Sequence, residues 1–575
     1  MPSERFDLVC LGGGVAAGYW AEELVSLHKS AAGGSGAVRP RICIVSAYPD
    51  GLVPYERSEI SKECLRPANT HSRDWQAWGN KAFPYTSGGN DREARGARWY
   101  RDNGVTVLPW CECYEVDLTN GGLELLQARN ISSRTRAKAK QISVTYGSLL
   151  IATGAAPRRL HGDHESACFC VRHTDLRGAR IERQDVYGLG SAHYLRDIGD
   201  CIKLVKALST TPPGGGRGDG NTVALVGGGL LCIEAAAAIV THYPGVQPVL
   251  LISGSHLMPE FFSPEMSRFY EDHLTEAGVS IQKNLKAERL WGLEEQGEFE
   301  TLGGDRVHFG PAPRGFSECR GVVLRSKDNK TIHVPARVVL LGIGSVPNSE
   351  LFAGQLELAE DGGICVDARC RALRPSAQGN GRGGGGGGAG SYLSRPVYAA
   401  GDVASFPLAL EGSRRVRHEH IQNARDMAVV VARNMAGNLS PFSMADASGT
   451  KKLPGGELPL YHPVPGFSSR FLGLSWRFYG VAEGDVVVLG ASEFRTTRTF
   501  GAFWVRGERV VGAFLEGGTI EQQIAVAQVT RLRPKVFSSR VLKDSELGDF
   551  LEDPGSIEAS DDSDLSQLLM CCRCV

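Results

Sequence analysis

The chain has 575 residues, of which 42% are hydrophobic and 22% are charged, and its formal net charge is -1. The length favours about four domains as a starting estimate, and the composition is that of an ordinary globular protein. The near-zero charge gives no support for a nucleic-acid partner, and no apolar run approaches the roughly 20 residues of a membrane-spanning helix.

The N-terminal residues predict a dinucleotide-binding turn. A buried strand is predicted over residues 6–11 and runs into the glycine-rich turn 12–14, after which a helix begins. Glycines allow a tight turn and a close backbone approach, and the free N–H groups of the helix start hold phosphates. Because Glu4 and Asp7 are acidic and precede this strand or lie in it, we expect no removable targeting peptide and a cytoplasmic protein.

The residues after the second predicted strand, 42–45, give a weaker signal. An acid at this strand end usually binds the adenosine ribose, and Asp50 is the nearest acid. Arg57 and Lys62 follow soon afterwards, where cations can neutralise a pyrophosphate and stabilise a reduced flavin. The alternative is an exposed helix face of alternating charge.

Two further strand ends complete a flavoenzyme layout. The strand 142–151 ends in Ala152-Thr153-Gly154, and Gly401-Asp402 follow a later strand. An aspartate at that place can accept hydrogen bonds from the ribityl hydroxyls of FAD. Alone it would be read as a helix cap.

A second fingerprint predicts a second dinucleotide. The strand 222–226 leads into the glycine turn 227–229 and another helix, so the chain is expected to pass electrons between two bound dinucleotides. Cys232 stands in place of the third fingerprint glycine, as a small packing residue or, alternatively, as a redox-sensing thiol.

The nicotinamide preference stays open. After the strand 248–252, Ser253, Ser255 and His256 stand where an acid would select NADH. The lack of an acid removes the repulsion of a 2′-phosphate, although no arginine is present to clamp one. NADH and NADPH are both carried as candidates.

The predicted fold is α/β, with two Rossmann-like three-layer domains for FAD and NAD(P) and a C-terminal α+β domain. The expected boundaries, in chain order, are FAD-binding 1–160, NAD(P)-binding 161–335, FAD-binding again 336–440 with a glycine-rich loop over 375–392, C-terminal domain 441–545, and an acidic tail 546–575. The glycine-rich loop and the tail lack the apolar residues of a packed core and are expected to be disordered.

The cysteines exclude one chemistry and leave another question open. Cys64 has no second cysteine at a spacing suited to a redox disulfide, so electrons are expected to leave the flavin directly. No cysteine spacing predicts a metal site. Cys571, Cys572 and Cys574 end the chain and give weak support for lipidation, with a plain flexible end as the favoured alternative.

Several motifs together resemble the monodehydroascorbate reductase family, flavoenzymes with the glutathione-reductase-like fold. They are Tyr55-Glu56-Arg57 with Ser61-Lys62, then residues 399–408, 417–425, 475–480 and 512–516. The resemblance runs from Phe6 to about Pro534, with insertions near 33–38, 163–190, 212–220 and 375–392.

The resemblance implies specific roles. Arg57 and Lys62 contact FAD, Glu419 and His420 lie near the nicotinamide and the flavin, and Arg425 helps to bind the ascorbyl radical. One departure concerns the acceptor pocket. The family carries tyrosines on both sides of Phe467, whereas this chain has Gly466 and Ser468 there.

The candidate catalytic residues are Lys62, Glu419, His420 and Arg425. The candidate cofactor-binding residues are Gly12, Gly13, Gly14, Ala16, Ala17, Asp50, Arg57, Lys62, Thr153, Gly154, Arg158, Gly227, Gly228, Gly229, Leu230, Glu234, Ser253, His256, Gly344, Asp402 and Ile421. The candidate substrate-binding residues are Arg425 and Ser468, and no metal ligand is predicted.

The predicted activity is an FAD-dependent oxidoreductase that takes hydride from NAD(P)H and reduces the monodehydroascorbate radical to ascorbate by one-electron steps. Two alternatives stay open at this point. One is an NADH-dependent reductase of a ferredoxin- or rubredoxin-type carrier. The other is a flavoprotein that resembles apoptosis-inducing factor. The oligomeric state is left undetermined.

Overall fold

The structure is a computed structural model. It describes residues 3–31, 39–48, 54–67, 96–127, 139–160, 192–209, 221–292, 295–302, 304–310, 319–375, 393, 395–439, 444–445, 451–452, 458–491 and 494–533. The candidate ribose ligand Asp50, residues 376–392 of the glycine-rich loop and the tail with its cysteines lie outside these segments.

A seven-stranded sheet carries the first glycine turn. Its order is β3-β2-β1-β6-β5-β4, and β20 pairs with β6 beside this path. The strands are β1 (Glu4–Leu11), β2 (Ile42–Val45), β3 (Val105–Leu108), β4 (Cys111–Asp117), β5 (Gly122–Gln127), β6 (Lys140–Ile151) and β20 (Val397–Ala399). Parallel pairing joins β1 to β2 and β6, β2 to β3, and β20 to β6, so the carboxyl ends of the central strands meet at one edge. The first glycine turn lies at that edge.

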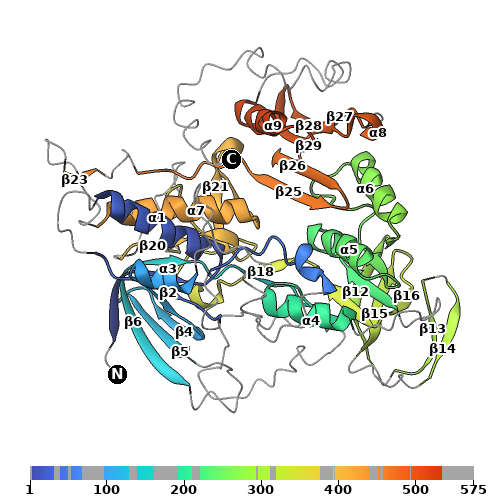
Figure 1. Cartoon of the computed structure of the whole chain (residues 1–575), viewed down its shortest axis with the longest axis horizontal. Helices are drawn as coiled ribbons and strands as arrows, with labels where there is room; N and C mark the ends of the chain where they lie inside the picture. Colours follow the sequence, from blue (N-terminus) through green and yellow to red (C-terminus); the bar gives the residue numbers. More distant parts are fainter. Residues whose placement is uncertain are drawn as a thin grey trace, which may run out of the picture.

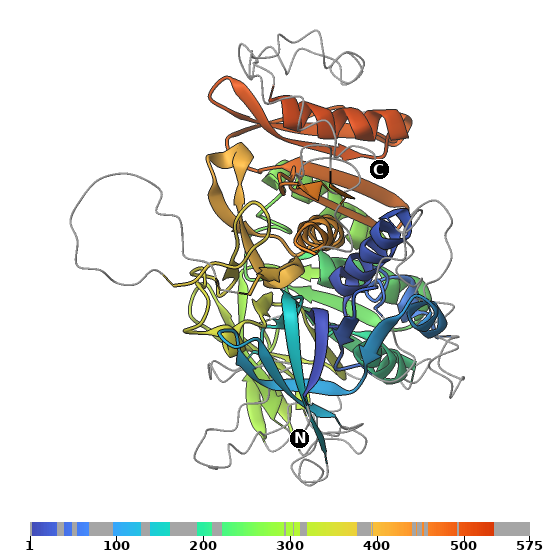
Figure 2. The same cartoon turned by 90° about the vertical axis from the view of Figure 1, so that its left-hand side faces the viewer.

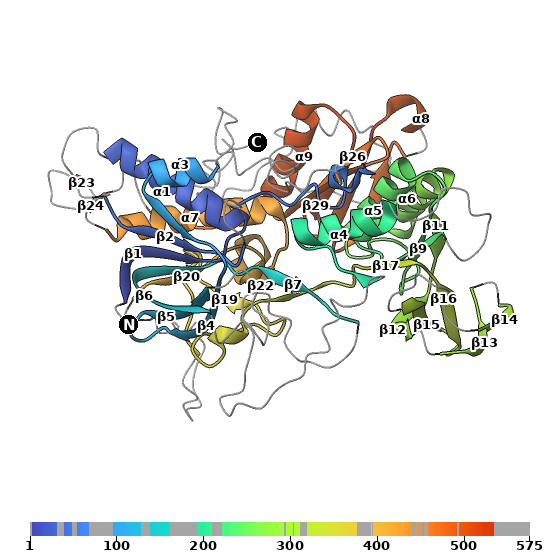
Figure 3. The ribbon, with the colours of Figure 1, turned by 60° about the horizontal axis from the view of Figure 1, so that its bottom comes forward.

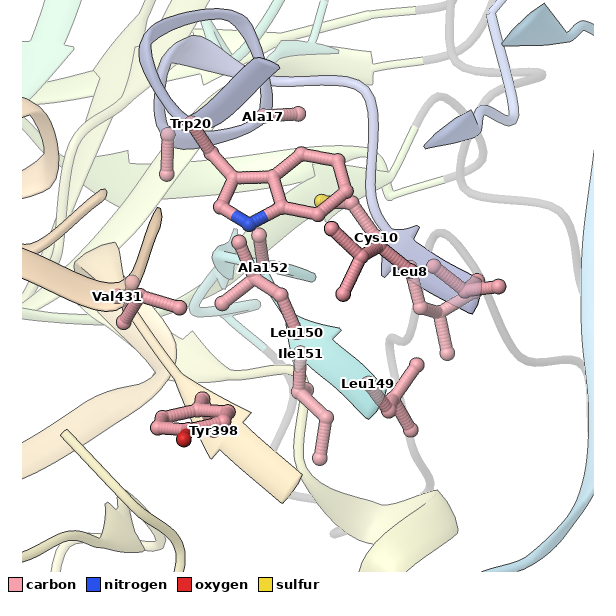
Figure 4. Packing of buried hydrophobic residues seen from close by; sticks show 14 of the residues in the cluster. Leu8, Cys10, Ala17, Trp20, Leu149, Leu150, Ile151, Ala152, Tyr398 and Val431 are labelled. Carbon is pink, nitrogen blue, oxygen red and sulfur yellow. The ribbon is translucent and has the colours of Figure 1, made fainter. Parts of the chain in front are cut away.

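Two helices from distant parts of the chain cover one face of this sheet (Figure 1). They are α1 (Val15–Ala31) and α7 (Ile421–Gly437), with the short α3 (Ala97–Asp102) beside them. Trp20 of α1 is fully buried over the strand ends of β1 and β6, and its indole N–H lies 3.2 Å from Met435 Sδ of α7 (Figure 4). Because both faces of the sheet are covered there, the end of β1 (Leu8–Leu11) and the whole of β2 are apolar and buried.

A second parallel sheet carries the second glycine turn. Its order is β11-β10-β9-β17-β8, and all its pairs are parallel. The strands are β8 (Ala192–His193), β9 (Thr222–Val226), β10 (Gln247–Leu251), β11 (Ser280–Gln282) and β17 (Val338–Leu341). The helices of this unit are α4 (Ile198–Ser209), α5 (Leu230–His242) and α6 (Pro264–Glu276). An antiparallel sheet of β12 (Leu285–Gly292), β15 (Cys319–Ser326) and β16 (Thr331–Pro335), and a hairpin of β13 (Gly297–Glu300) and β14 (Arg306–Phe309), follow β11.

The chain passes between these two units through one short ribbon, visible near the middle of Figure 3. The ribbon pairs β7 (Ala155–Pro157) with β18 (Ser345–Pro347) in the antiparallel sense. On the return, η5 (Glu350–Phe352) leads to a small sheet of β19 (Ile364–Cys365), β21 (Ala404–Leu408) and β22 (Arg414–Arg417), with η6 (Gly401–Val403) and η7 (Ala409–Glu411) at its turns.

The C-terminal unit is a five-stranded antiparallel sheet of order β25-β26-β29-β28-β27. Its strands are β25 (Gly466–Phe471), β26 (Leu474–Gly480), β27 (Asp485–Leu489), β28 (Phe500–Arg506) and β29 (Arg509–Glu516). The helix α9 (Ile520–Leu532) covers the outer face of this sheet, and the short α8 (Phe494–Thr497) precedes β28 (Figure 2). The hairpin of β23 (Met444–Ala445) and β24 (Lys451–Lys452) lies upstream. A capping box of Thr519 and Gln522 fixes the start of α9.

The predicted α/β fold with a C-terminal sheet domain is confirmed. Pairing of β20 with β6 joins residues near 398 to residues near 150 in one sheet. The boundaries 1–160, 161–335, 336–440, 441–545 and 546–575 stay a prediction. Within the described segments, no helix is both long enough and apolar enough to cross a membrane.

Candidate active site

The first glycine turn has no room for side chains. Gly12 has φ +133°, and a Cβ there would lie 2.1 Å from Ala152 O. A Cβ on Gly13 would lie 2.2 Å from Ser46 Oγ at the end of β2. The turn therefore has to be glycine at both positions. The helix α1 begins directly after it, with Ala16 and Ala17 buried in its first turn, and the N–H groups of such a helix start suit a phosphate.

Arg57 lies beside this turn. Its Nη2 is 3.6 Å from the place that a Cβ on Gly14 would occupy, and it donates a hydrogen bond of 2.5 Å to the Tyr48 hydroxyl. Its Nε is buried without a hydrogen-bond partner among the described residues. A half-buried guanidinium with an unused, buried Nε donor at a helix start suits an anionic pyrophosphate. This observation shows that the residues fit FAD.

The other wall of the same site comes from three separate segments. Asp402 lies in η6, where Gly401 has φ +76°, and Asp402 Oδ2 accepts a hydrogen bond of 3.0 Å from Arg196 Nη2. Arg196 Nη2 also lies 2.9 Å from the Cβ position of Gly154, so it fills the space between that residue and Asp402. Thr153 is held by Asn348, through Thr153 Oγ1 to Asn348 O and Asn348 Nδ2 to Thr153 O, both 2.8 Å.

Arg196 was not among the site residues predicted from the sequence. It follows β8 in the second unit but contacts a carboxylate 206 positions later in the chain. A local pattern carries no sign of such a contact. The local feature that could have pointed to Arg196 is its position just after β8, because candidate residues also follow the ends of other parallel strands.

Lys62 and Glu234, predicted in separate roles, form a buried ion pair. Lys62 Nζ lies 3.0 Å from Glu234 Oε1, with side-chain exposures of 15% and 6%. Ser61 Oγ donates to Glu234 Oε2 and Ser469 Oγ to Glu234 Oε1, each at 2.5 Å. Lys62 Nζ also donates to Ser58 O at 2.8 Å. Glu234 of α5 therefore holds Lys62 in place, and Ser469 of β25 connects the C-terminal sheet to the pair.

Glu419 is held by the neighbouring segments. Arg417 pairs with Glu419 and with Asp361, and its Nη1 donates to Asp402 O at 3.1 Å. The Ser345 hydroxyl is hydrogen-bonded to Glu419. This arrangement places Glu419 beside the β7–β18 ribbon. There Gly344 has φ +100° and Gly344 O accepts from the Arg158 backbone N–H at 2.9 Å.

His420 and the neighbouring His418 are neutral at physiological pH. Burial lowers the pKa of His418 to about 3. Burial, together with the charges of Arg425 and Lys62, lowers the pKa of His420 to about 4. His420 caps α7, just before Ile421, and its Nδ1 accepts from the Gln422 backbone N–H at 3.3 Å.

An aromatic side chain from the C-terminal sheet packs against both imidazoles. The ring of Phe467 lies 4.2 Å from that of His418 and 5.6 Å from that of His420, centroid to centroid. Phe467 and Ser469, two residues apart on β25, both turn toward the first two units. Ser468, predicted at the acceptor site, lies between them in sequence, is exposed and faces the opposite way.

Arg425, predicted to attract the acceptor, is paired with a carboxylate. Its guanidinium forms an ion pair with Glu56 and lies 5.2 Å from the centre of the Tyr19 ring. The Tyr19 hydroxyl donates to the same Glu56 oxygen at 2.9 Å. Most of the charge that Arg425 would offer to an anion is therefore balanced within the protein.

The second glycine turn repeats the geometry of the first. Gly227 has φ +130°, and a Cβ there would lie 2.2 Å from Gly342 O. Cys232 Sγ lies 2.5 Å from the place that a Cβ on Gly342 would occupy. The thiol donates a hydrogen bond to Val226 O at 3.4 Å. Burial raises the pKa of the Cys232 thiol to about 12, so it stays protonated. The cysteine fills the contact between helix and strand, and the thiol is not poised for redox sensing.

Around that turn the surface is open. Gly229 caps α5 before Leu230, and nothing lies within 4 Å of its Cβ position, whereas Gly228 faces Ile252. After β10, Ser253 and Ser255 are exposed, and Ser255 Oγ lies 3.0 Å from His256 Nδ1. These groups can contact the adenosine end of a dinucleotide.

No dithiol or metal centre competes with this arrangement in the described part of the chain. Burial raises the pKa of the Cys64 thiol to about 12, and the Cys201 thiol donates to Cys64 O at 3.5 Å, with both cysteines free. No group of three or more His, Cys, Asp or Glu side chains in these segments could hold a metal ion.

Comparisons with known proteins follow the same division of the chain. Residues 6–428 match the family described as pyridine nucleotide-disulphide oxidoreductase. Residues 464–549 match the C-terminal domain described as monodehydroascorbate reductase 3-like.

Similar curated proteins cover nearly the whole chain. "Monodehydroascorbate reductase 2, peroxisomal" of Oryza sativa subsp. japonica is 31% identical over 93% of this chain and 86% of its own length. "Monodehydroascorbate reductase 4, peroxisomal" of Arabidopsis thaliana is 29% identical over 92% of this chain and 83% of its own length. "Monodehydroascorbate reductase 4, cytosolic" of Oryza sativa subsp. japonica is 29% identical over 94% and 97%.

Solved structures show the same fold at lower identity. The covalent complex of putidaredoxin reductase with putidaredoxin matches with a TM-score of 0.63 and 20% identity, covering 97% of this chain and all of that one. This chain therefore belongs to the pyridine nucleotide-disulphide oxidoreductase family and, within it, to the monodehydroascorbate reductases, enzymes that use FAD and NAD(P)H.

Proposed function

We propose that this chain reduces the monodehydroascorbate radical to ascorbate with NAD(P)H as the hydride donor. One NAD(P)H and one proton reduce two radical anions to two ascorbate anions, so electrons and charge balance. The observation that carries the proposal is the C-terminal domain, which matches monodehydroascorbate reductases in sequence and brings Phe467 to the half-buried histidines and Ser469 to Glu234.

The residues of the chain divide the work as follows. FAD, when bound, would supply the chemistry that accepts one hydride, which carries two electrons, and releases these electrons one at a time. The turn at Gly12 and the Arg57 guanidinium would hold its diphosphate, and Asp402 with Arg196 would hold its ribityl chain. Lys62, held by Glu234, would supply positive charge beside the flavin ring.

We assign His420 a role as a neutral hydrogen-bond donor that positions the bound groups, not as an acid or base. Because its Nδ1 accepts the Gln422 N–H, the neutral ring carries its proton on Nε2, where it can donate a hydrogen bond. A neutral imidazole also does not repel the nicotinamide ring of the donor, which becomes positively charged when it gives up its hydride. Glu419, fixed by Arg417, supplies a carboxylate on the same side.

We further propose that the chain accepts NADPH as well as NADH. Ser253, Ser255 and His256 replace an acid after β10, and exposed hydroxyls and an imidazole accommodate a 2′-phosphate without repulsion. A preference for NADH of more than about a hundredfold in kcat/KM would contradict this part of the proposal.

The cellular location proposed is the cytoplasm. Similar proteins carry names that say cytosolic in one case and peroxisomal in others. Imaging of the tagged full-length chain in the source cell, with a peroxisomal marker beside it, tests this point directly.

The redoxin-reductase alternative has less support, because those solved structures share the fold at 20–21% identity. The decisive experiment is anaerobic reduction of the FAD-loaded protein by NADH or NADPH, followed by rapid mixing with enzymatically generated monodehydroascorbate. Fast reoxidation of the flavin supports the proposed function. A reduced flavin that ignores the radical but transfers electrons to a ferredoxin would overturn it.

A further inference from the structure

A short segment of the second unit is bonded directly to its glycine turn. Residues 257–262 follow β10, and the Met258 backbone N–H donates to Gly228 O at 3.1 Å. Met258 O accepts in turn from the backbone N–H groups of Phe261 and Phe262, at 2.9 and 2.8 Å. We refer to residues 257–262 as the Met258 turn. Its place relative to the second glycine turn is therefore set by the backbone itself.

Met258 has a backbone conformation that its residue type rarely adopts. Its φ is +47°, and its side chain is 1% exposed. A bulky residue keeps a left-handed conformation only where its surroundings impose it, and such residues cluster at functional sites. The hydrogen bonds to Gly228, Phe261 and Phe262 hold Met258 in this conformation. They thereby fix the direction in which the turn presents its aromatic side chains.

Phe261 of this turn contacts the C-terminal sheet. Its ring centroid lies 4.4 Å from that of Phe467 on β25 and 5.4 Å from that of Phe478 on β26. Phe467 and Phe478 are cross-strand partners, so their side chains share one face of the sheet. Ser469, two residues after Phe467, uses the same face when it donates to Glu234 of α5. The inner face of β25 is thus held by the second unit at two points.

The contacts continue from Phe467 to the wall of the flavin site. The Phe467 ring lies 4.2 Å from that of His418 and 5.6 Å from that of His420, centroid to centroid. Arg417, the residue before His418, donates to Asp402 O at 3.1 Å. An unbroken series of contacts therefore runs from the second glycine turn, through the Met258 turn and Phe467, to the histidines beside Asp402.

We propose that Phe261 is a positioning residue for hydride transfer, which holds Phe467 against the histidines and so fixes the second glycine turn relative to the flavin site. This inference rests on the proposed use of NAD(P)H as hydride donor and does not depend on the electron acceptor. The two dinucleotides would be held by different units, and reacting atoms have to approach to about 3–3.5 Å. A small shift of one unit against the other would therefore slow the transfer strongly.

The test compares Phe261→Ala and Phe261→Leu with Phe269→Ala. Phe269 is the matched control, because it is also half-buried and also packs on the C-terminal domain, 4.8 Å from Phe494 and 5.0 Å from Phe500 between ring centroids. Its described ring contacts include neither Phe467 nor a histidine.

Two kinds of measurement are made on the FAD-loaded proteins. Anaerobic mixing with NADH or NADPH over a range of concentrations gives the limiting rate of flavin reduction and the dissociation constant separately. The long-wavelength charge-transfer absorbance of chemically reduced protein with NAD⁺ reports how the nicotinamide stacks on the flavin, without turnover.

We expect Phe261→Ala to slow the limiting rate about tenfold and to weaken the charge-transfer absorbance, with dissociation constants changed less than about threefold. Phe261→Leu keeps most of the apolar contact and should recover most of the rate. Phe269→Ala should lower the midpoint of thermal unfolding to a similar degree, with the rate and the absorbance unchanged. Equal limiting rates for Phe261→Ala and Phe269→Ala would overturn the proposal, as would a dissociation constant whose rise accounts for the whole loss.

Phe467→Ala tests whether Phe261 acts through Phe467. It should slow flavin reduction at least as much as Phe261→Ala, and the double variant should be no slower than Phe467→Ala alone, because residues in one series of contacts are not additive. Effects that multiply in the double variant would show that Phe261 acts independently of Phe467, and the proposal would be wrong.

The inference and the proposed function fail in different ways. If neither NADH nor NADPH reduces the flavin of the wild type, the proposed function is wrong, and the charge-transfer absorbance of chemically reduced protein still judges Phe261. If the wild type is reduced but ignores monodehydroascorbate, only the proposed acceptor is wrong. If the wild type reduces the radical and Phe261→Ala keeps its limiting rate and its absorbance, the function stands and the assignment of Phe261 is wrong.

Discussion

The two glycine turns have almost the same backbone and very different surroundings. Gly12 and Gly227 have φ +133° and +130°, and a Cβ on either would lie 2.1 or 2.2 Å from a carbonyl oxygen of the neighbouring strand end. Around the first turn, Ser46 seals Gly13 and Arg57 approaches Gly14. Around the second, nothing lies within 4 Å of the Cβ position of Gly229.

This difference separates a resident cofactor from an exchanging one. We expect a dinucleotide bound at the first turn to leave slowly, because it would meet the half-buried Arg57 guanidinium. One bound at the second turn meets exposed serines and an open helix start, and it can leave after each turnover. The shared backbone therefore sets what binds, whereas the side chains around it set how long it stays.

We expect the largest effects from alanine substitution of the first glycine of each turn, because each change should affect a different dinucleotide. Gly12→Ala forces a methyl group into Ala152 O, so the purified protein should lose nearly all FAD, measured by flavin absorbance after gel filtration. Gly227→Ala should keep its FAD but lose reduction by NADH and NADPH by more than about a hundredfold. Each change also places a side chain at positive φ.

Gly96→Ala is the matched control, because nothing lies within 4 Å of its Cβ position and its φ is −74°. It should retain FAD and activity. Loss of FAD from Gly227→Ala to the same degree as from Gly12→Ala would show that the two turns are not independent sites.

The Lys62–Glu234 pair connects the two turns, because Glu234 lies on the helix that begins at the second turn. Glu234→Gln removes one partner of a buried ion pair, a change that costs about 3–5 kcal/mol in comparable sites. We expect a clear drop in the midpoint of thermal unfolding and flavin reduction slowed about tenfold. Ser469→Ala, which removes only one hydrogen bond to Glu234, should have a milder effect of the same kind.

Glu23→Gln provides the control for charge removal. Its partner Arg433 is 49% exposed, and such surface pairs contribute about 0–1 kcal/mol. If Glu234→Gln were no more harmful than Glu23→Gln, Glu234 would not be the residue that holds Lys62.

Much of the fold could be predicted from the sequence, whereas the side-chain contacts between its units could not. The strands at 42–45 and 222–226 occur where their apolar runs predict them. Local pattern suffices there, because these strands are buried on both sides.

The long-range contacts had no such local signal. Arg196 reaches Asp402 across 206 positions, and Ser469 reaches Glu234 across 235. Glu234 was singled out as part of the second fingerprint, but its carboxylate is held by Lys62 and two serines. Such contacts depend on how three units pack together, and residue spacing within one motif does not contain that information.

The region around His418 and His420 differs from the first turn in its charge, because these histidines are neutral whereas Arg57 beside the first turn is always charged. His418 and His420 have pKa values lowered to about 3 and about 4, so the folded protein keeps both neutral where an unfolded chain would protonate them. Their contribution to stability is complete above the ordinary histidine pKa and is lost as pH falls through the folded values. Between pH 6.5 and 4 each should cost up to about 1.4 kcal/mol per pH unit.

Urea unfolding at pH 7 and pH 5.5 measures this effect. The wild type should lose stability at the lower pH, and the double variant His418→Gln with His420→Asn should lose less, because asparagine preserves the cap of α7. An identical pH dependence in wild type and variant would mean that carboxylates elsewhere account for the loss.

The smallest expected effect comes from restoring the missing glycine of the second turn. Cys232→Gly removes a buried thiol that packs between Val226 O and Gly342 and places a glycine inside α5. Glycine in a helix interior costs about 1 kcal/mol relative to alanine, so the unfolding midpoint should fall slightly. KM for NADH and NADPH should change less than about threefold, because the turn itself is set by Gly227. A tenfold change in KM would mean that the Cys232 thiol shapes the dinucleotide site directly. The difference between the two turns would then depend on the packing of α5 as well as on the side chains around each turn.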